Sequence, residues 1–419
     1  MAQKVKKSRW NIFRKWRLPK IKRILWISFL HSLLLLLMGY FWLGTSYTFE
    51  DEALLIKWTT LVKKKVLGID PKPLPDKVIF INTATSKIPV YSDTDPLSLK
   101  PSVELITDRE KLARMLEQMV PFKDSIGLIV VDVLFDIPAP GDSVLGKIFH
   151  ELGDKVLAVS YMPEVDSIVP PLFSVPYALS TYRSSAEMYF KYPVAYKGKK
   201  TVPTVMYEKT SGSVITKKGL FFRDHKKYIL KSPVTDFKVT LNDFKIGSDL
   251  HTTGFAVHHL ETLSMMGQFM DKADFRKMFS GKLVMIGDFS TDIHETVMGP
   301  IPGVLILYNA YLTLVDGDNV MKFGWLFLMI AGFTWITHRI LSGKGLYLLD
   351  SWKRKFKSGW IHFMIDSVDE ILYLAILTLL SYFLFNIHIS ILILFIYLKI
   401  SELVLDHFKE RKKRKLIHT

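Results

Sequence analysis

Long, predominantly apolar stretches lie at both ends of the chain. The first, Ile24 to Leu43, has about the 20 residues that a helix needs to cross a bilayer. Three more follow near the C-terminus, over 323–341, 371–385 and 387–405. Only Asn386 and His388 interrupt the last two, and one helix formed from both would be far longer than a bilayer is thick. The pattern predicts four transmembrane helices, one N-terminal and three C-terminal, with a tight turn between the last two.

A different pattern fills residues 45–321, where short apolar runs alternate with helical patterns. Several runs lack the apolar–polar alternation of a half-exposed strand and are predicted as buried strands, at 77–82, 127–131, 155–160 and 282–286. Helical spacing predicts helices at 109–119, 143–152 and 252–266. Thr107-Asp108 would cap the first of them. Buried strands separated by helices predict an α/β fold, a mostly parallel sheet flanked by helices.

Residues 163–249 interrupt this alternation. They are rich in Tyr, Lys, Thr, Pro and Gly, and their apolar positions show no clear helical period. We expect an insertion of short strands and loops there.

The positive charge of the chain is concentrated beside the predicted spans. The formal net charge is +16, of which residues 1–23 contribute +10, 339–370 contribute +2 and 399–419 contribute +4, so that 24–338 is formally neutral. Lys/Arg-rich flanks stay in the cytoplasm, and all three lie on one side only if the chain crosses four times. This places 45–321 outside the cytoplasm and both termini inside. The flanks favour the lipid bilayer and its anionic headgroups as partners, and nucleic acid is not expected.

Smaller features refine the membrane part. The cytoplasmic loop 342–369 interleaves aromatic and aliphatic residues with Lys and Arg, which predicts a short amphipathic helix on the membrane surface. In the last span, Lys399 and Glu402 lie one helical turn apart and are expected to pair near its inner end. The first span is predicted to be a retained signal anchor, because a poor cleavage site follows it. Residues 407–419 would form a basic cytoplasmic tail.

Polar residues follow three of the predicted strands. The carboxyl ends of parallel strands meet at one edge of a sheet, where open α/β sheets bind ligands, so these side chains are predicted to line one crevice. Carboxylates and a carboxamide suit a small ligand or a hard cation. The alternative is that they cap helices and fix loops, as Asp and Asn commonly do. The candidate ligand-binding residues are Asn82, Asp132, Asp136, Asp288, Asp292 and His294.

Catalytic chemistry has little support in the sequence. There is no Cys, which excludes disulfides and thiolate catalysis, and no HExxH, P-loop, GxSxG or GxGxxG motif. His258-His259 falls inside the predicted 252–266 helix, where adjacent rings point to different faces and are poorly placed to share a metal ion. We therefore expect neither enzymatic activity nor a cofactor, with an extracytoplasmic hydrolase as the open alternative.

The segment FSGKLVMIGDFSTDIHETVMGPIPGVLILYNAYLTLVDG resembles the closing motif of the CHASE domain of type 2, a sensory extracellular domain associated with cyclases and histidine kinases. The matching positions are Gly281, Lys282, Ile286, Gly287, Asp292, Thr296, Pro302, Gly303, Asn309 and Ala310. Upstream, IVVDVLF (129–135) with Asp142 is similar to the family's strand, acid and Asp-led helix. Asp108-Arg109 with Leu112-Ala113 is similar to its Arg-led first helix. The first strand ends in Asn82, where the family usually has Asp.

The resemblance covers about residues 79–317 and implies one span before the domain, three after it and a sensory function. No output domain follows the last span, so a signal would pass to a separate cytoplasmic protein. The prediction is a membrane-anchored sensory or ligand-binding protein of the bacterial inner membrane, with its main domain in the periplasm. The alternative is a non-enzymatic scaffold or accessory subunit of an envelope complex. Ligand, partner and homo-oligomerisation stay open.

Overall fold

The computed structural model describes residues 20–45, 50–92, 102–162, 167–180, 188–219, 221–244, 254–342, 346 and 349–417. The basic segment 1–19, parts of the predicted insertion and residues 252–253 of a predicted helix lie outside the described residues. The chain divides into two compact units. We call residues 44–320 the α/β unit, and residues 1–43 with 321–419 the helical unit.

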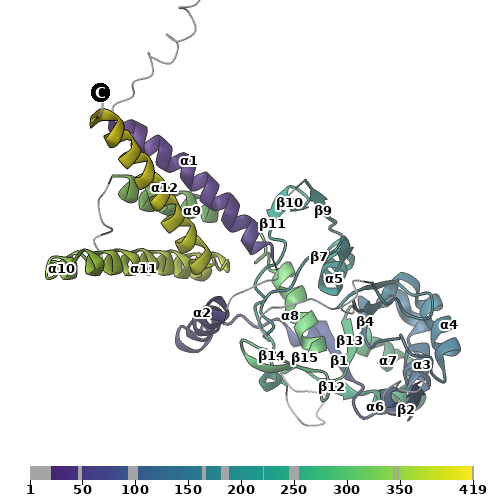
Figure 1. Cartoon of the computed structure of the whole chain (residues 1–419). Coiled ribbons are helices and arrows are strands. Elements are labelled where there is room, and N and C mark those ends of the chain that lie inside the picture. Colours follow the sequence, from purple (N-terminus) through teal and green to yellow (C-terminus); the bar gives the residue numbers. More distant parts are fainter. Residues whose placement is uncertain are drawn as a thin grey trace, which may run out of the picture. The chain divides into compact units, whose positions relative to one another are not determined.

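The α/β unit is built on a six-stranded parallel sheet (Figure 1). Its strands are β1 (Val78–Asn82), β4 (Leu128–Asp132), β5 (Val156–Ser160), β6 (Tyr177–Leu179), β12 (Val257–His259) and β13 (Leu283–Gly287). Their order is β12-β1-β13-β4-β5-β6. The last strand in sequence thus lies between the first two, with Gly287 opposite both Asn82 and Asp132. The predicted α/β fold with a parallel sheet is confirmed.

Helices cover both faces of this sheet. Alternate strand residues point to opposite faces, so that Phe80 is buried in one core and Ile81 in the other. The helices of the first core are α2 (Glu50–Leu61), α5 (Val202–Ser211) and α8 (Gly303–Val315). Those of the second are α3 (Arg109–Glu117), α4 (Asp142–Leu152), α6 (Leu260–Phe269) and α7 (Lys272–Phe279). Burial on both sides explains why these strands are uninterrupted apolar runs in the sequence.

The predicted helix at 252–266 is confirmed only from Leu260 onward. Val257–His259 form the edge strand β12, which pairs with β1, and α6 begins only at Leu260. His258 and His259 therefore lie on a strand. The pairing partner of β12 is distant in sequence, so local periodicity did not reveal it. By contrast, the cap predicted for α3 is confirmed, since the Asp108 carboxylate accepts from the backbone N–H of Glu110 and Lys111.

The segment 163–249 is more integrated than the predicted insertion of short strands and loops. It supplies β6, the edge strand of the main sheet, and α5, which packs against α8. Its described part also contains two small antiparallel sheets: β7 (Ala195–Tyr196) with β8 (Lys199–Lys200), and β9 (Ile215–Lys218), β10 (Phe221–Asp224) and β11 (Lys227–Ile229). Elsewhere in the unit lie the hairpins β2 (Lys87–Ser92) with β3 (Ser102–Thr107), and β14 (Ile293–Thr296) with β15 (Gly299–Pro302).

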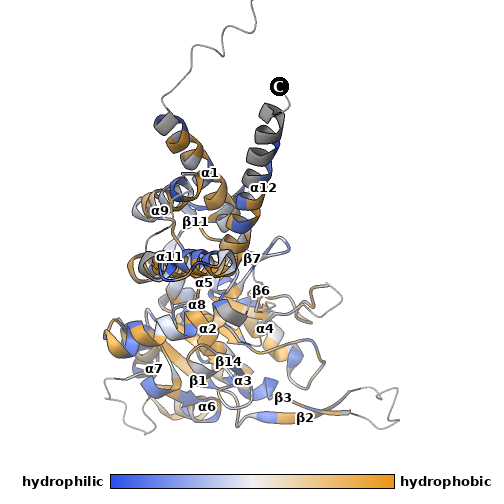
Figure 2. Cartoon of the chain, turned by 60° about the vertical axis from the view of Figure 1, so that its left-hand side comes forward, coloured by the Kyte–Doolittle hydropathy of each residue, from blue (hydrophilic) through white to orange (hydrophobic). Residues whose placement is uncertain are grey.

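The helical unit contains three helices, among the described residues, that are long and apolar enough to span a bilayer (Figure 2). They are α1 (Lys20–Leu43), α9 (Phe323–Leu341) and α11 (Gly359–Phe385). Polar side chains join them: Trp325 Nε1 donates to Ser381 Oγ at 2.8 Å, and His31 Nδ1 lies 3.0 Å from Thr337 Oγ1. Their length and apolar composition indicate a membrane protein.

The fourth predicted span, 387–405, is not among these helices. Asn386 adopts a left-handed conformation and ends α11, so α12 (Ile391–Ile417) begins only at Ile391. Its uncharged part, 391–398, is about 12 Å long at 1.5 Å per residue, too short to cross alone. Lys399 does pair with Glu402, as predicted, at 2.9 Å. Instead of one amphipathic surface helix, the described part of 342–369 holds the short α10 (Asp350–Lys353) and the start of α11.

Candidate ligand cleft

A cleft of about 610 Å³ opens at the carboxyl ends of the central strands of the α/β unit. Its volume falls within the range of small-molecule sites, roughly 300–1,000 Å³. β13 lies between β1 and β4, so the loops that follow these strands share one edge of the sheet. Loops after parallel strands line the ligand crevice of open α/β sheets. Of the predicted site residues, the cleft is lined by Asp132, Asp136, Asp288, Asp292 and His294.

Asn82 is the predicted site residue that does not line the cleft. Its side chain is buried, and its Oδ1 accepts from the backbone N–H of Ala84 at 2.9 Å and of Phe289 at 3.2 Å. It therefore ties the loop after β1 to the loop after β13. Asn82 therefore has the alternative role considered for these residues, that of fixing loops.

Asp288 is held in place by a dense set of donors. Its carboxylate accepts from the backbone N–H of Ser290 and Thr291 and from the Thr291 hydroxyl, and it forms an ion pair with Lys87. Burial alone would raise the pKa of Asp288, but the hydrogen bonds from Lys87, Thr291 and Ser290 lower it to about 2. Asp288 is thus a fully compensated anion that fastens the β2 strand to the rim of the cleft.

Asp292 and His294 form a second pair, with 2.9 Å between Asp292 Oδ1 and His294 Nε2. The Asp292 carboxylate lies against Gly303, the first residue of α8, where a Cβ atom would overlap it. The backbone N–H of Gly303 also donates to the Asp292 carbonyl at 2.8 Å. The positive end of a helix dipole stabilises a carboxylate at this position. The glycine is therefore required for the acid to approach the helix end.

Asp132 is the last residue of β4, and within the described part of the chain its carboxylate lacks the hydrogen-bond donors and charged partners that Asp288 and Asp292 have. No hydrogen bond or ion pair joins its carboxylate to any residue that the structure describes. Burial, and then the charge of Asp292, raise the pKa of Asp132 well above its usual value. Gly287 lies opposite Asp132 on the neighbouring strand, and a Cβ atom at Gly287 would come within 3.3 Å of Asp132 Cβ and within 2.8 Å of Val304 Cβ. Asp132 is therefore the uncompensated acid of the cleft.

Asp136 lies further along the same loop, next to a buried cation. Arg109 is completely buried, and its Nη2 donates to the Leu134 carbonyl at 2.7 Å while its guanidinium lies 4.3 Å from the centre of the Phe135 ring. Burial lowers the pKa of Arg109 to about 10, although Asp142 and Asp136 act in the opposite direction. Arg109 thus fixes the loop after β4 and offsets the charge of Asp136.

The sequence analysis missed the aromatic wall of the cleft. Tyr189 and Tyr192 line it, and both belong to the segment interpreted as an insertion. The Tyr192 hydroxyl donates to the Ser180 carbonyl at 2.7 Å, and the ring centres of Tyr189 and His294 are 4.8 Å apart. Burial, followed by the charge of Asp132, raises the pKa of Tyr192 well above its usual value. Tyr189 lies beside β14, where its backbone N–H donates to the Glu295 carbonyl at 2.8 Å, whereas Tyr192 contacts the chain just after β6. No sequence motif predicts this placement.

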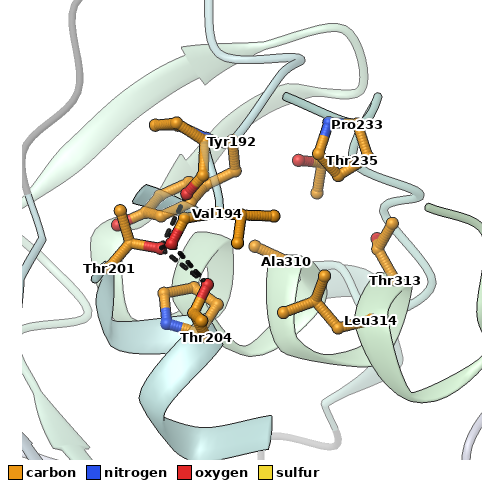
Figure 3. Close-up of a pocket in the computed structure, with 11 residues that line it drawn as sticks. Tyr192, Val194, Thr201, Thr204, Pro233, Thr235, Ala310, Thr313 and Leu314 are labelled. Atoms are coloured by element: carbon orange, nitrogen blue, oxygen red, sulfur yellow. Dashed lines mark hydrogen bonds between the residues drawn. The ribbon is translucent and has the colours of Figure 1, made fainter. Parts of the chain in front are cut away.

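A second, much smaller cavity lies between α5 and α8 (Figure 3). Its volume of about 10 Å³ is at the lower limit for one water molecule. The hydroxyl groups of Thr201 and Thr204 both donate to the Val194 carbonyl, so they serve the local backbone. Among the residues that the structure describes, no group of three or more His, Asp or Glu side chains is arranged to hold a metal ion. The cleft is the site that merits a functional interpretation.

Comparison of the chain with protein-family models, with curated proteins and with solved structures found no match.

Proposed function

We propose that this protein is a membrane-anchored extracytoplasmic sensory protein of the CHASE type 2 kind, whose α/β unit binds a small ligand and relays its binding to a separate cytoplasmic protein. The observation that carries the proposal is the cleft at the carboxyl ends of β1, β13 and β4, lined by charged and aromatic side chains. A purely structural α/β unit has no need for a cleft with an uncompensated carboxylate, because such a group costs stability.

The relay is supported by the position of α8. Its first residue, Gly303, lines the cleft together with Ile306 and Leu307, and the residues after its end lead to α9, which begins at Phe323. The helix is fixed near its middle, since Asn309 exchanges two hydrogen bonds with the backbone of Val239, at 2.9 and 2.7 Å. A ligand that displaces the start of α8 would therefore move the segment that enters the membrane. Such a signal requires tighter binding to one of two conformations.

In this proposal α12 completes the membrane part as a fourth span in the bacterial inner membrane, with the termini in the cytoplasm and the α/β unit in the periplasm. Lys399 bonds to Glu370 of α11 and to Glu402, both at 2.9 Å, and pairing lowers the cost of charges in a bilayer. The exposed basic residues Arg354, Lys355 and Lys357 would contact anionic lipid headgroups.

The alternative function, a scaffold of an envelope complex, is supported by the β2–β3 hairpin (Figure 2). Tyr91, Val103 and Leu105 on this hairpin are 71%, 55% and 66% exposed. Exposed apolar side chains on a projecting element are typical of protein contacts. Leu105 also lines the cleft, whereas Tyr91 and Val103 do not, so substitutions of Tyr91 and Val103 test the hairpin surface separately from the cleft.

The test is a ligand screen by thermal unfolding of the full chain in lipid nanodiscs. A compound that binds in the cleft should raise the unfolding temperature of the wild type. It should not do so in Leu134→Trp, which places a large ring in the cleft from an exposed position. Val144→Trp, at a similarly exposed position on α4 away from the cleft, is the matched control.

The sensory proposal fails if no compound shifts the wild type while an envelope protein co-purifies with it. Loss of that co-purification in Tyr91→Ser/Val103→Ser would then establish the scaffold function.

A further inference from the structure

The residues that line the cleft carry an excess of negative charge. Among the described residues of the lining, Lys87 is the single Lys or Arg. It is opposed by five acids, Glu104, Asp132, Asp136, Asp288 and Asp292. A concave site of one charge sign concentrates ligands of the opposite sign. The cleft as a whole therefore favours a cation.

Most of the acids that line the cleft already have a positively charged partner or are screened by solvent. Asp288 is paired with Lys87, and Asp292 with His294 and the start of α8. Asp136 lies in the field of the buried Arg109, and Glu104 is exposed on β3, where water and salt screen its charge. Asp132, at the end of the central strand, has no such partner among the described residues. The missing counter-charge belongs next to Asp132.

The surroundings of Asp132 distinguish an organic cation from a metal ion. The Tyr189 and Tyr192 rings line the same cleft, and aromatic faces attract ammonium groups. Ile306 and Leu307 of α8 add apolar surface, which suits the carbon skeleton of a ligand. The described residues offer no group of three His, Asp or Glu side chains that could coordinate a metal. Divalent cations require several oxygen ligands at once.

We infer that the cleft binds a small organic cation, an ammonium compound whose charged nitrogen pairs with Asp132 and packs against Tyr189 and Tyr192. This inference rests on the proposed ligand-binding function and adds the chemical class of the ligand. The carbon skeleton would lie toward α8, so that the same molecule touches the acid and the helix that leads to α9.

The experiment compares four-carbon probes of equal length and different charge, using the full chain in nanodiscs. The probes are 1,4-diaminobutane, 1,4-butanediol and succinate, with CaCl₂ as an inorganic cation. At about 100 times its Kd, the diamine should raise the unfolding temperature by roughly 5–10 °C, while the diol and succinate leave it unchanged. In Asp132→Asn the affinity for the diamine should fall roughly 30-fold or more. Asp76→Asn, which removes an exposed acid outside the cleft, should bind like the wild type.

Each other outcome overturns the inference in a distinguishable way. If succinate or the diol binds in place of the diamine, and Leu134→Trp abolishes that binding, the ligand class is wrong but the ligand cleft stands. Stabilisation by Ca²⁺ that is lost in Asp132→Asn would replace the organic cation by a metal ion. Diamine binding that is equal in the wild type and Asp132→Asn removes Asp132 from the site. If neither these probes nor the wider screen binds, the proposed function fails as well.

Discussion

Two regions of the α/β unit bury charged side chains, and they do so in opposite ways. In the first, which we call the α2 junction, Glu52 of α2 pairs with Lys191. Lys64, in the helical turn after α2, pairs with Asp236. Lys191 Nζ lies 2.8 Å from Glu52 Oε1, and Lys64 Nζ lies 2.9 Å from Asp236 Oδ1 and donates to the Phe237 carbonyl at 2.6 Å. The second region is the cleft, where no described residue pairs with Asp132. Burial of charge is thus common to both, and compensation separates a structural junction from a candidate binding site.

The largest change in unfolding free energy is expected at the α2 junction, where the buried charges are paired with opposite charges. The Glu52 and Lys191 side chains are each 1% exposed, so Lys191→Ala leaves the Glu52 carboxylate buried without this partner. Removing one member of such a pair costs about 3–5 kcal/mol of unfolding free energy. Thermal unfolding of the full chain in nanodiscs measures the loss. Lys111→Ala, which breaks a solvent-exposed pair with Glu261, is the control and should change little. A cost for Lys191→Ala no larger than the control's would contradict the structural role of the junction.

Asp288 should show a smaller effect with a characteristic pH dependence. Its pKa of about 2 lies below the usual value of 3.8, so its ionised form stabilises the folded state. This contribution is complete above pH 4 and is lost as the pH falls through about 2. Asp288→Asn should therefore cost roughly 1–2 kcal/mol at pH 7, allowing for solvent screening. The difference from the wild type should vanish near pH 2. An unfolding free energy difference that is the same at both pH values would show that the ion pair with Lys87 contributes nothing.

Asp132 should behave in the opposite sense, because its pKa is raised rather than lowered. Its ionised form opposes folding above its usual pKa, so replacing it by a neutral isostere stabilises the ligand-free protein at pH 7. Asp132→Asn should add roughly 0.5–2 kcal/mol, the usual range for a stabilising substitution. The gain should disappear as the pH falls below the usual Asp pKa of about 3.9, because the wild-type acid is then protonated in both states. Destabilisation by Asp132→Asn at pH 7 would mean that Asp132 holds the fold, and the contrast with the α2 junction would collapse.

Much of the α/β fold was predictable because its signals are local. Each buried strand is a short apolar run, and the helices α3 and α4 show their apolar faces within about three turns. The positions of Asp132 and Asp288 followed from the same signals, since each comes at or just after the end of a buried strand. In contrast, the local pattern predicts a helix where β12 lies and no helix where α5 lies, because tertiary contacts determine the conformation of both segments.

The amino-acid pattern was enough to predict a membrane protein with an α/β domain and with acids at the ends of its strands. The pairing of these acids became known only from the folded arrangement of the strands and loops. The position of β13 between β1 and β4 brings Lys87 to Asp288 and sets Asp132 apart, and a segment distant from these strands in sequence supplies Tyr189 and Tyr192 to the same cleft. Apolar runs and helix caps depend on neighbours a few residues away, so they can be recognised along the chain. Charge compensation depends on groups that folding brings together from distant segments, and it is visible only in three dimensions.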